Sequence, residues 1–359
     1  MADSFLLGEN SSVILNLTRA FLAQLVLLGH AFDFFGVFSY IGQSNPPPQI
    51  GRLAVVVFFI LSGLLIAYTV NRKKESKDYT FLAYFIERFC RIYSALIPAL
   101  VVIALIDFLP FNTFERDYPA GTNNLTSFII HALNLQEYPF SNWEVLGSGL
   151  QLWSISVEWW LYMFYGLVTL AMPRKRNFWL YILLIVSCVS VLSNTITGTG
   201  NGIAVDWFLG VFIYFNLRHK IFKDIKTTPA ITLGISLIII GLIRVYAFSP
   251  LSSLKAYDLH FGVLAAGSLF FFILGLQKTS FRFPAFVIKS ARFFAGYSFT
   301  LYLTHFALLT VFYEFENAFS PHFLLFVSII SCNIFASFFA MFTENKNKYL
   351  RLKLKRIFF

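Results

Sequence analysis

The sequence predicts an all-α, polytopic integral membrane protein, and three observations lead to this prediction. Hydrophobic residues make up 57% of the 359 residues and charged residues only 13%. Soluble domains average about 25% charged residues, so this composition excludes an ordinary water-soluble fold. The apolar residues gather in stretches close to the roughly 20 residues that a helix needs to cross a bilayer. Basic residues separate these stretches on alternate sides, as membrane topology requires.

Hydropathy divides the chain into about ten expected spans. They cover residues 13–37, 52–70, 93–110, 151–172, 178–197, 202–217, 229–247, 260–276, 294–314 and 322–342. The first span is too long for a secretory signal and contains Arg19 and His30. No small-residue cleavage site follows it, so we expect it to remain in the mature protein.

The distribution of positive charge predicts the orientation of the spans. With a cytosolic N-terminus, the cytosolic segments hold 23 of the 28 lysines and arginines, and the outer loops hold only Arg116 and Lys255. The positive-inside rule favours this arrangement, with an even number of spans and both termini cytosolic. The net charge of +10 then reflects topology, so no nucleic-acid partner is expected. We expect a multi-pass protein of the bacterial inner membrane, with the lipid bilayer as its main partner.

The expected domain organisation is a transmembrane domain at residues 1–345 and a basic cytosolic tail at residues 346–359. One outer loop, residues 111–150, is long and rich in aromatic and acidic side chains. Such side chains can stack on sugars and hydrogen-bond to them, and they equally suit a lid that packs on the bundle. The three cysteines are scattered, which predicts neither a disulfide framework nor a metal site.

Ionisable residues at membrane depth are costly and usually functional. Arg19 and His30 lie eleven residues apart in the first expected span. Eleven residues are close to three helical turns, so both side chains share one face, about 16 Å apart along the axis. His30 then lies toward the outer side, where an imidazole suits general-base chemistry near neutral pH. A packing histidine that bonds a neighbouring helix is the alternative.

Two later spans carry polar stripes. Ser154, Glu158 and Tyr162 repeat at intervals of four residues, which places them on one helix face. A second face holds Ser298, Tyr302 and His305. Such stripes suit a reaction site, but they also suit hydrogen bonding between helices. The stretch Phe58-Phe59-Ile60-Leu61-Ser62-Gly63 adds small residues at which helices can approach closely.

Arg88 and Arg91 lie one helical turn apart after the second span. Two guanidinium groups at this spacing can clamp a phosphate, because each arginine binds phosphate bidentately. Contact with anionic lipid is the alternative, since basic residues on the cytosolic side also attract lipid headgroups.

Together these motifs resemble the acyltransferase-3 membrane proteins, a family that includes bacterial O-antigen acetylases. The resemblance lies in an ordered set of short motifs. They are Arg19 with His30, the Phe58–Gly63 stretch, Arg88-Phe89-Cys90-Arg91, Trp153-Ser154-Ile155-Ser156-Val157-Glu158, Leu301-Tyr302-Leu303-Thr304-His305, and Glu344. The chain departs from the family pattern at Val55–Val57, at Thr304 in place of a tryptophan, and at Asn345 in place of a proline.

The resemblance implies an acyl-CoA donor, usually acetyl-CoA, and a carbohydrate acceptor outside the membrane, such as O-antigen. It implies catalytic roles for His30, Glu158 and Arg19, and donor-binding roles for Arg88, Arg91, Ser62, Tyr302 and His305. No metal is expected. Many relatives carry an appended soluble esterase-like domain, and this chain is expected to be a stand-alone form. The sequence is compatible with a homo-oligomer.

Two other functions remain open at this point. A transporter or flippase would use the intramembrane polar groups to line a path, and inverted repeats or paired broken spans would favour it. Neither feature is found in the sequence. A non-catalytic subunit of a polysaccharide assembly complex is the third candidate, and acetylation of a glycan by the purified protein alone would exclude it.

Overall fold

The computed structural model describes residues 7–37, 50–109, 121–139, 143–174, 177–196, 202–222, 225–248, 259–277, 279 and 281–358. Within these ranges the protein is all-helical, with no β-strand. The predicted all-α class is therefore confirmed. Expectations about residues 111–120 of the long loop fall outside the described part of the chain.

Eight of the described helices are long and apolar enough to cross a membrane. They are α1 (Glu9–Phe35), α2 (Ile50–Lys73), α3 (Phe81–Asp107), α7 (Phe178–Ile196), α9 (Thr227–Phe248), α10 (Leu259–Leu276), α11 (Ala285–Tyr313) and α12 (Pro321–Phe342). The protein is therefore multi-pass in character.

Four shorter helices complete the described fold. They are α5 (Leu125–Ala132), α6 (Trp153–Gly166), α8 (Ile203–Leu217) and α13 (Asn347–Phe358). A π-helical turn, Leu167–Ala171, continues α6. Two of the ten expected spans thus correspond to the shorter helices α6 and α8, so the count of ten spans remains a prediction.

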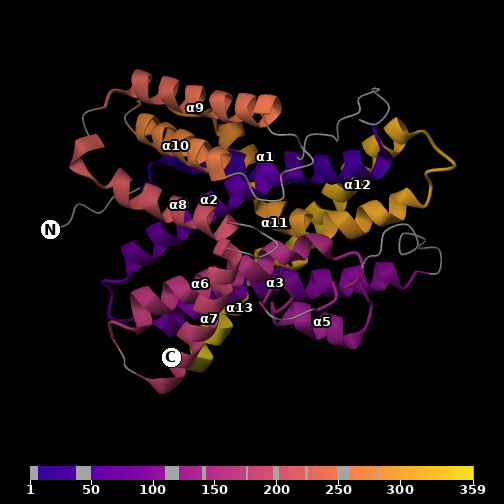
Figure 1. Cartoon of the computed structure of the whole chain (residues 1–359), viewed down its shortest axis with the longest axis horizontal. Helices are drawn as coiled ribbons and strands as arrows, with labels where there is room; N and C mark the ends of the chain where they lie inside the picture. The colour runs from indigo at the N-terminus through magenta and orange to yellow at the C-terminus, as the bar shows by residue number, and fades with distance from the viewer. Residues whose placement is uncertain are drawn as a thin grey trace.

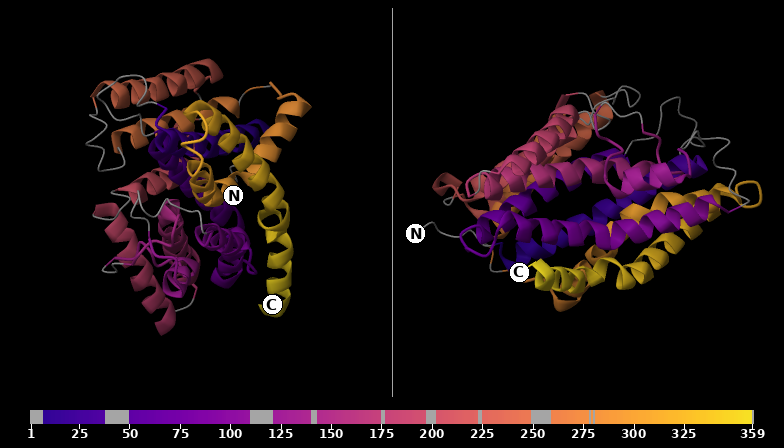
Figure 2. Two further views of the ribbon diagram at one scale, coloured as in Figure 1. Left: turned by 90° about the vertical axis from the view of Figure 1, so that its right-hand side faces the viewer. Right: turned by 90° about the horizontal axis from the view of Figure 1, so that it is seen from below.

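The helices form an elongated bundle whose long axis is followed by α1, α3, α11 and α12 (Figure 1). Seen along that axis, α13 appears lengthwise, so it crosses the bundle instead of running with it (Figure 2). The beginning of α1 and the whole of α13 lie at the same end of the molecule (Figure 2). This end carries the basic tail. Because α1 begins and α13 lies at the same end, the fold agrees with an even number of membrane crossings. The cytosolic location of this end remains a prediction.

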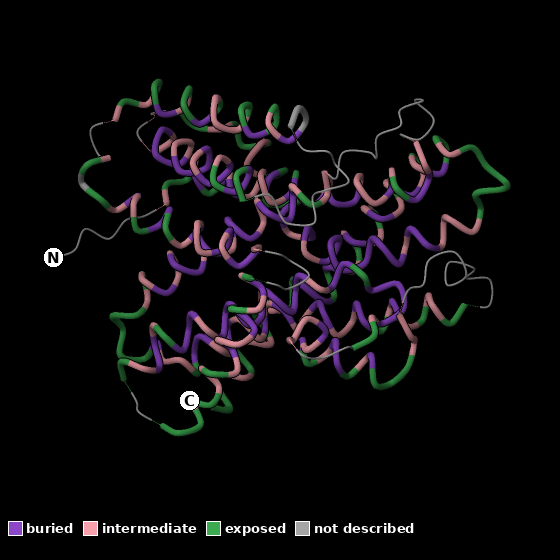
Figure 3. Tube along the Cα trace, viewed as in Figure 1, coloured by how far each residue is buried: buried purple, intermediate pink, exposed green. Residues whose placement is uncertain are grey.

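Buried residues concentrate along the inside of the bundle, and the outward faces are exposed (Figure 3). These outward faces are strongly apolar. On α9 alone, the exposed large apolar side chains are Leu233, Ile235, Ile239, Ile240, Leu242 and Ile243. Apolar side chains facing outward over whole helices are expected where lipid surrounds the protein, because lipid is as apolar as they are.

Small residues bring α2 and α8 into close contact, as the Phe58–Gly63 stretch predicts. A Cβ atom at Gly63 would overlap the carbonyl oxygen of Trp207, and one at Gly210 would overlap the carbonyl oxygen of Ile60. The two backbones can approach this closely only because neither glycine has a side chain. This packing fixes the depth and rotation of α2, which carries Ser62.

Polar side chains join α1 to α11 and α12. Gln24 Nε2 donates to Asn333 Oδ1 at 2.7 Å, and Asn333 Nδ2 donates back to Gln24 Oε1 at 3.0 Å. The Tyr297 hydroxyl donates to the same Asn333 oxygen at 2.9 Å. The reciprocal amide pair joins α1 to α12, and the Tyr297 bond joins α11 to the same asparagine, so α12 links the two helices that carry His30 and His305.

The described part of the long outer loop packs on the bundle. Gln136 Nε2 donates to the carbonyl oxygen of Leu152 at 2.9 Å, just before α6 begins. The carbonyl oxygen of Asn134 accepts bonds from Ser156 Oγ at 2.7 Å and from Trp160 Nε1 at 2.9 Å. These bonds position α6 from the outer side, as the packing interpretation of the loop expects.

Candidate active site

An inner cavity of about 370 Å³ opens among α1, α2, α3, α6, α11 and α13. Its polar lining contains most of the residues that the motifs single out. They are Arg19, Ser62, Arg88, Arg91, Ser154, Glu158, Tyr162, Ser298 and Tyr302. Arg19 and Glu158, which are 139 positions apart in the sequence, therefore line the same cavity. The polar stripe on α6 faces this cavity, as its spacing predicts.

Glu158 is the hydrogen-bond centre of one cavity wall. Its Oε1 atom accepts from Ser62 Oγ at 2.7 Å and from the Tyr162 hydroxyl at 2.6 Å. Trp207 Nε1 donates to Ser62 Oγ at 3.2 Å, which ties α8 to the same group. The carboxylate is thus supported by neutral donors while it shares the cavity with four arginines. Its expected role in orienting His30 remains a prediction.

Tyr302 faces the cavity from α11. Its hydroxyl lies 2.6 Å from Ser154 Oγ and donates to the carbonyl oxygen of Gln151 at 3.0 Å. Gln151 Nε2 donates in turn to the carbonyl oxygen of Leu303 at 2.8 Å. These bonds fix the beginning of α6 against α11, so the two predicted polar stripes meet.

Arg91 has a carboxylate partner that is distant in the sequence. Its Nη1 atom lies 2.6 Å from Glu344 Oε1, and the Glu344 side chain is only 3% exposed. The other carboxylate oxygen accepts from the backbone nitrogen and the hydroxyl of Thr300, both at 3.1 Å. Arg91 is therefore held in an ion pair, and the proposed phosphate clamp rests mainly on Arg88.

Arg88 has only a longer contact with a carboxylate, because its Nη2 atom lies 3.9 Å from Glu87 Oε2. Its guanidinium lies over the rings of Tyr84 and Tyr162, at 5.8 and 5.9 Å from the ring centres. Its Nε atom is buried and has no hydrogen-bond partner among the described residues. The group is therefore oriented by aromatic faces while it keeps a donor free for an anionic ligand.

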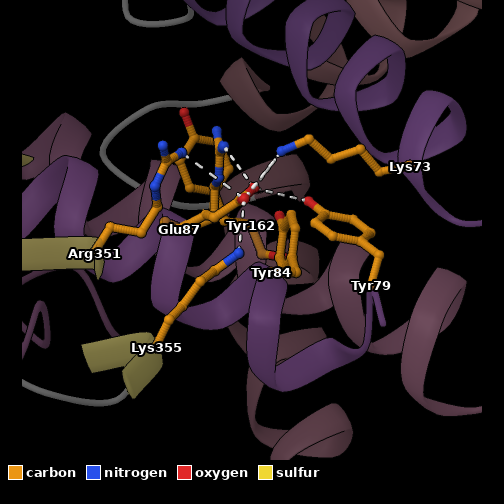
Figure 4. A network of polar contacts seen from close by, with 8 residues as sticks. Lys73, Tyr79, Tyr84, Glu87, Tyr162, Arg351 and Lys355 are labelled. Carbon is orange, nitrogen blue, oxygen red and sulfur yellow. Dashed lines mark hydrogen bonds and ion pairs between the residues drawn. The ribbon is translucent and has the colours of Figure 1, made fainter. Parts of the chain in front are cut away.

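Glu87 gathers basic side chains near the mouth of the cavity (Figure 4). Lys73 Nζ lies 2.9 Å from its carboxylate, Lys355 Nζ lies at 3.6 Å and Arg351 Nη1 at 3.9 Å. The Tyr79 hydroxyl donates to Glu87 at 3.1 Å. Burial, followed by the nearby Glu87 charge, raises the pKa of Tyr79, so the phenol keeps its proton and remains a donor. This network attaches α13 to α3.

Sequence reasoning missed the contribution of α13. Asn347 and Arg351 line the inner cavity, although residues 346–359 were expected to form only a basic tail. The signal was present, because the apolar residues Leu350, Leu354 and Ile357 recur at intervals of four and three among basic residues, which is the spacing of an amphipathic helix. The boundary between a transmembrane domain and a tail at residue 345 remains a prediction.

Arg19 lines the inner cavity and also a smaller adjoining cavity of about 230 Å³. The smaller cavity is shared with Arg91, Arg292 and Glu344. Arg19 forms no ion pair or hydrogen bond with the residues that the structure describes. Its positive charge is therefore available to a ligand at the end of the bundle where α1 begins.

His30 lies against His305, outside the lining of the inner cavity. The two ring centres are 5.3 Å apart, with 32° between the ring planes. The edge of Phe306 meets the His30 ring at 5.2 Å between centres. The structure thus brings together the two histidines that the motifs identify, and it separates them from the arginines.

An outer cavity of about 420 Å³ lies between the far ends of α1 and α11 and the beginning of α12. Its lining includes Asp33, Phe34, Tyr313, Glu316 and Asn317. The Phe34 ring lies 5.0 Å from that of Phe306, which in turn contacts His30. One layer of aromatic rings therefore separates the histidine pair from the outer cavity.

The described residues contain no group of three or more histidine, cysteine or acidic side chains that could hold a metal ion.

Comparison with known proteins identifies the family. Residues 13–342 match the profile of the acyltransferase-3 family, described as an acyltransferase domain. The chain belongs to this family. It is also similar to an O-acetyl transferase of Shigella phage Sf6, with 22% identity over 179 residues, which is 47% of this chain and 49% of that protein. The chain thus matches about half the length of that relative. No solved structure matches it.

The chain therefore contains the acyltransferase domain of this family, and the resemblance drawn from the motifs is confirmed. An acyltransferase needs an acyl donor and an acceptor. In this acyltransferase the arginines surround the inner cavity and the histidines lie between the inner and outer cavities. The roles of the individual residues remain predictions.

Proposed function

We propose that this acyltransferase moves an acyl group, which we expect to be acetyl, from cytosolic acyl-CoA to a hydroxyl of a polysaccharide outside the inner membrane. O-antigen is an acceptor of this kind. The observation that carries the proposal is the order of residues along α1. Arg19 lines the inner cavity, His30 lies against His305, and Asp33 lines the outer cavity. A single helix therefore passes from a donor site to an acceptor site.

The donor site is the inner cavity. Arg19, Arg88 and Arg351 present positive charge there, and Arg88 keeps an unpartnered Nε atom. Guanidinium groups suit the phosphates of coenzyme A, because they bind phosphate oxygens with paired hydrogen bonds. With the phosphates held near the mouth, the flexible arm that ends in the thioester extends into the bundle toward His30. Ser62, Glu158 and Tyr302 would contact this arm along the cavity wall.

The acceptor site is the outer cavity. Asp33 and Glu316 supply hydrogen-bond acceptors for sugar hydroxyls, Asn317 supplies both donors and acceptors, and Tyr313 supplies an aromatic face. The printed name of the phage Sf6 relative supports acetyl as the transferred group. The acceptor's identity as a polysaccharide rests on the resemblance to the family.

His30 is the residue that we place at the reaction. It either removes the proton from the acceptor hydroxyl or carries the acyl group between donor and acceptor. The carboxylate of Glu158 offsets part of the charge of the arginines in the inner cavity. Arg19 attracts the donor phosphates from the beginning of α1. In this proposal, the charged residues in the cytosolic half of the bundle bind the donor, and His30 transfers the proton in the middle of the bundle.

Replacement of His30 by alanine tests the proposal. The variant and the wild-type protein are purified, placed in lipid nanodiscs and given radiolabelled acetyl-CoA together with surface polysaccharide from cells that lack the protein. We expect His30→Ala to lower transfer at least about 100-fold, the scale of general acid-base catalysis. His219→Ala, at an exposed histidine after α8, is the matched control and should transfer normally. Undiminished transfer by His30→Ala would contradict the proposal.

A further inference from the structure

His305 has surroundings that do not suit donor binding. Its side chain is completely buried and does not line the inner cavity, unlike Tyr302 one turn earlier. It contacts His30 instead, with 5.3 Å between the ring centres. The role that the motif alone implies for His305, contact with the acyl donor, therefore has little support from its position.

Backbone carbonyl groups fix the proton on one nitrogen of the His305 ring. Its Nδ1 atom lies 3.0 Å from the oxygen of Leu301 and 2.9 Å from that of Tyr302. A carbonyl oxygen can only accept, so Nδ1 must carry the hydrogen. In the neutral ring, Nε2 is then an acceptor with a free lone pair. The helix backbone thus holds the imidazole in the tautomer that a base requires.

The Nε2 atom of His305 is buried and has no hydrogen-bond partner among the described residues. Leaving a buried acceptor unsatisfied is unfavourable, so such atoms are rare in folded proteins and often have a catalytic role. A hydroxyl group from a substrate would satisfy it. The His30 ring also forms no hydrogen bond with the described residues, so both imidazoles in the pair are available for reaction.

We propose that His305 is a second catalytic residue, whose Nε2 atom removes the proton from the acceptor hydroxyl while His30 carries the acyl group. This inference rests on the proposed function. It follows from one chemical restriction. Once a nitrogen of His30 has been acylated, the lone pair of that nitrogen forms the bond to the acyl group, so that nitrogen cannot act as the base. A second base has to lie beside it, and His305 is the imidazole in contact with it.

The two half-reactions balance without another reactant. In the first, a ring nitrogen of His30 attacks the thioester carbonyl carbon, the carbon–sulfur bond breaks, and the proton lost by the imidazole passes to the thiolate. In the second, the acceptor oxygen attacks the acyl carbon and its proton passes to His305 Nε2. The carbon–nitrogen bond breaks, and this proton returns to His30. Both imidazoles are then neutral again, and the products are the free thiol and the ester.

The position of the pair agrees with this sequence of steps. From the inner side, Tyr302 of α11 lines the cavity assigned to the donor, three residues before His305. From the outer side, Phe306 contacts both His30 and Phe34, and Phe34 lines the outer cavity. The acyl group can therefore arrive from one side of the histidine pair and the hydroxyl from the other.

His305→Asn is the variant that tests the inference. Its amide nitrogen can keep a donor near the carbonyl oxygens of Leu301 and Tyr302, but the side chain has no basic nitrogen. His305→Gln is a second variant in case the first fails to fold. Thr304→Val is the matched control, because Thr304 is also buried on α11 and its hydroxyl bonds only the carbonyl oxygen of Thr300.

The measurement separates the half-reactions. Protein in nanodiscs is mixed with radiolabelled acetyl-CoA, and coenzyme A release and protein-bound label are followed, first alone and then with surface polysaccharide from cells lacking the protein. We expect His305→Asn to release about one coenzyme A per protein and to retain the label, with transfer to polysaccharide at least 100-fold slower. Thr304→Val should behave as wild type.

Other outcomes would overturn the inference. Equal losses of coenzyme A release and of transfer in both His305 variants would indicate a donor-binding or structural role. Normal transfer by either variant would exclude His305 as the base. Failure of both variants to fold, judged by gel filtration and thermal unfolding, would assign His305 to structure. Absence of any transfer by the wild-type protein would overturn the proposed function and this inference together.

Discussion

Arg91 and Glu344 show how a single pair of residues holds distant parts of this protein together. Glu344 follows α12, yet its carboxylate bonds both Arg91 of α3 and Thr300 of α11. Charged groups taken out of water are stable only when their hydrogen bonds are satisfied, and both oxygens of Glu344 are satisfied here. The pair therefore contributes to the geometry of the inner cavity in addition to any contact with a donor.

Removal of both partners should destabilise the protein by less than the two single removals added together. Arg91→Gln leaves a buried carboxylate and Glu344→Gln leaves an arginine without its partner, so each should cost about 3–5 kcal/mol. The double variant should cost less than the sum, by roughly 0.5–3 kcal/mol. Thermal unfolding of the four proteins in the same detergent measures this coupling. Strictly additive losses would show that the ion pair has no energetic role.

His131 gives the protein a pH-dependent contact outside the membrane-spanning helices. The side chain is 1% exposed, its Nδ1 atom donates to the carbonyl oxygen of Ser127 at 2.8 Å, and its Nε2 atom accepts from Leu146 N at 3.4 Å. Burial lowers the pKa of His131 to about 4, against the smaller opposing effect of the Ser127 bond. The folded protein therefore favours the neutral ring.

The sign of the pH effect follows from this lowered pKa. In the unfolded chain the imidazole binds a proton near pH 6.5, above the folded pKa, so protons favour unfolding. The neutral His131 ring contributes on the order of 3 kcal/mol to the free energy of unfolding. This contribution is complete above pH 6.5 and is lost as the pH falls toward about 4. Unfolding temperatures measured between pH 7.5 and 4.5 should fall less steeply in His131→Asn. Parallel curves for the two proteins would refute this.

The residues of the candidate site show what periodicity can and cannot predict. The interval of four residues in Ser154, Glu158 and Tyr162 places them on one face of α6, and that face does line the cavity. Periodicity along one helix says nothing about the rotation of another. The contacts of His30 with His305, and of Arg91 with Glu344, join segments more than 250 residues apart and depend on how the helices pack.

At the scale of elements, glycines set the distance between α2 and α8. Gly63 lies against the backbone of Trp207, and Trp207 also donates to Ser62, so the close approach and the cavity wall share the same residues. A larger residue at position 63 would separate the helices and shift Ser62 relative to Glu158. Helix packing and site geometry are therefore coupled at this point.

Gly63→Ala should lower both stability and activity. The added methyl group would overlap backbone atoms, which cannot move aside as a flexible side chain does, and such overpacking costs about 1–3 kcal/mol or more. Gly51→Ala is the control on the same helix, because a Cβ atom there meets its nearest neighbour at an ordinary 3.8 Å. Thermal unfolding and acetyl transfer should decline only in the first variant. Similar behaviour of both variants would contradict the close-packing explanation.

The tail shows an element that composition alone describes incompletely. A count of basic residues in 346–359 predicts cytosolic charge, whereas the order of apolar and basic residues folds 347–358 into α13. Arg351 and Lys355 then approach Glu87, and Tyr349, Leu352 and Ile357 stay exposed. An amphipathic helix that crosses the bundle end suits the boundary between lipid headgroups and hydrocarbon, where both kinds of side chain are satisfied.

At the scale of the whole molecule, the two cavities give the reaction a direction only if the bundle has the orientation that its charges predict. The end of α2 and the residue after it hold Arg72, Lys73 and Lys74, whereas the turn between α11 and α12 holds Glu314 and Glu316. The lining of the inner cavity includes Thr69 and Glu87, which lie near this basic segment in the sequence, and the outer cavity includes Glu316 of the turn between α11 and α12. The positive-inside rule then predicts that the proposed donor site faces the cytosol and that the proposed acceptor site faces outward.

Single-cysteine labelling tests this orientation. In a protein whose Cys90, Cys188 and Cys332 are replaced by alanine, a cysteine is introduced by Lys74→Cys or by Ala318→Cys, both at exposed positions. A membrane-impermeant maleimide should label Ala318→Cys in intact spheroplasts, and Lys74→Cys only after the membrane is opened. Labelling of Lys74→Cys in intact cells would reverse the orientation. The basic cavity would then face away from the cytosolic acyl-CoA pool, and an acyl-CoA donor at the arginines would be untenable.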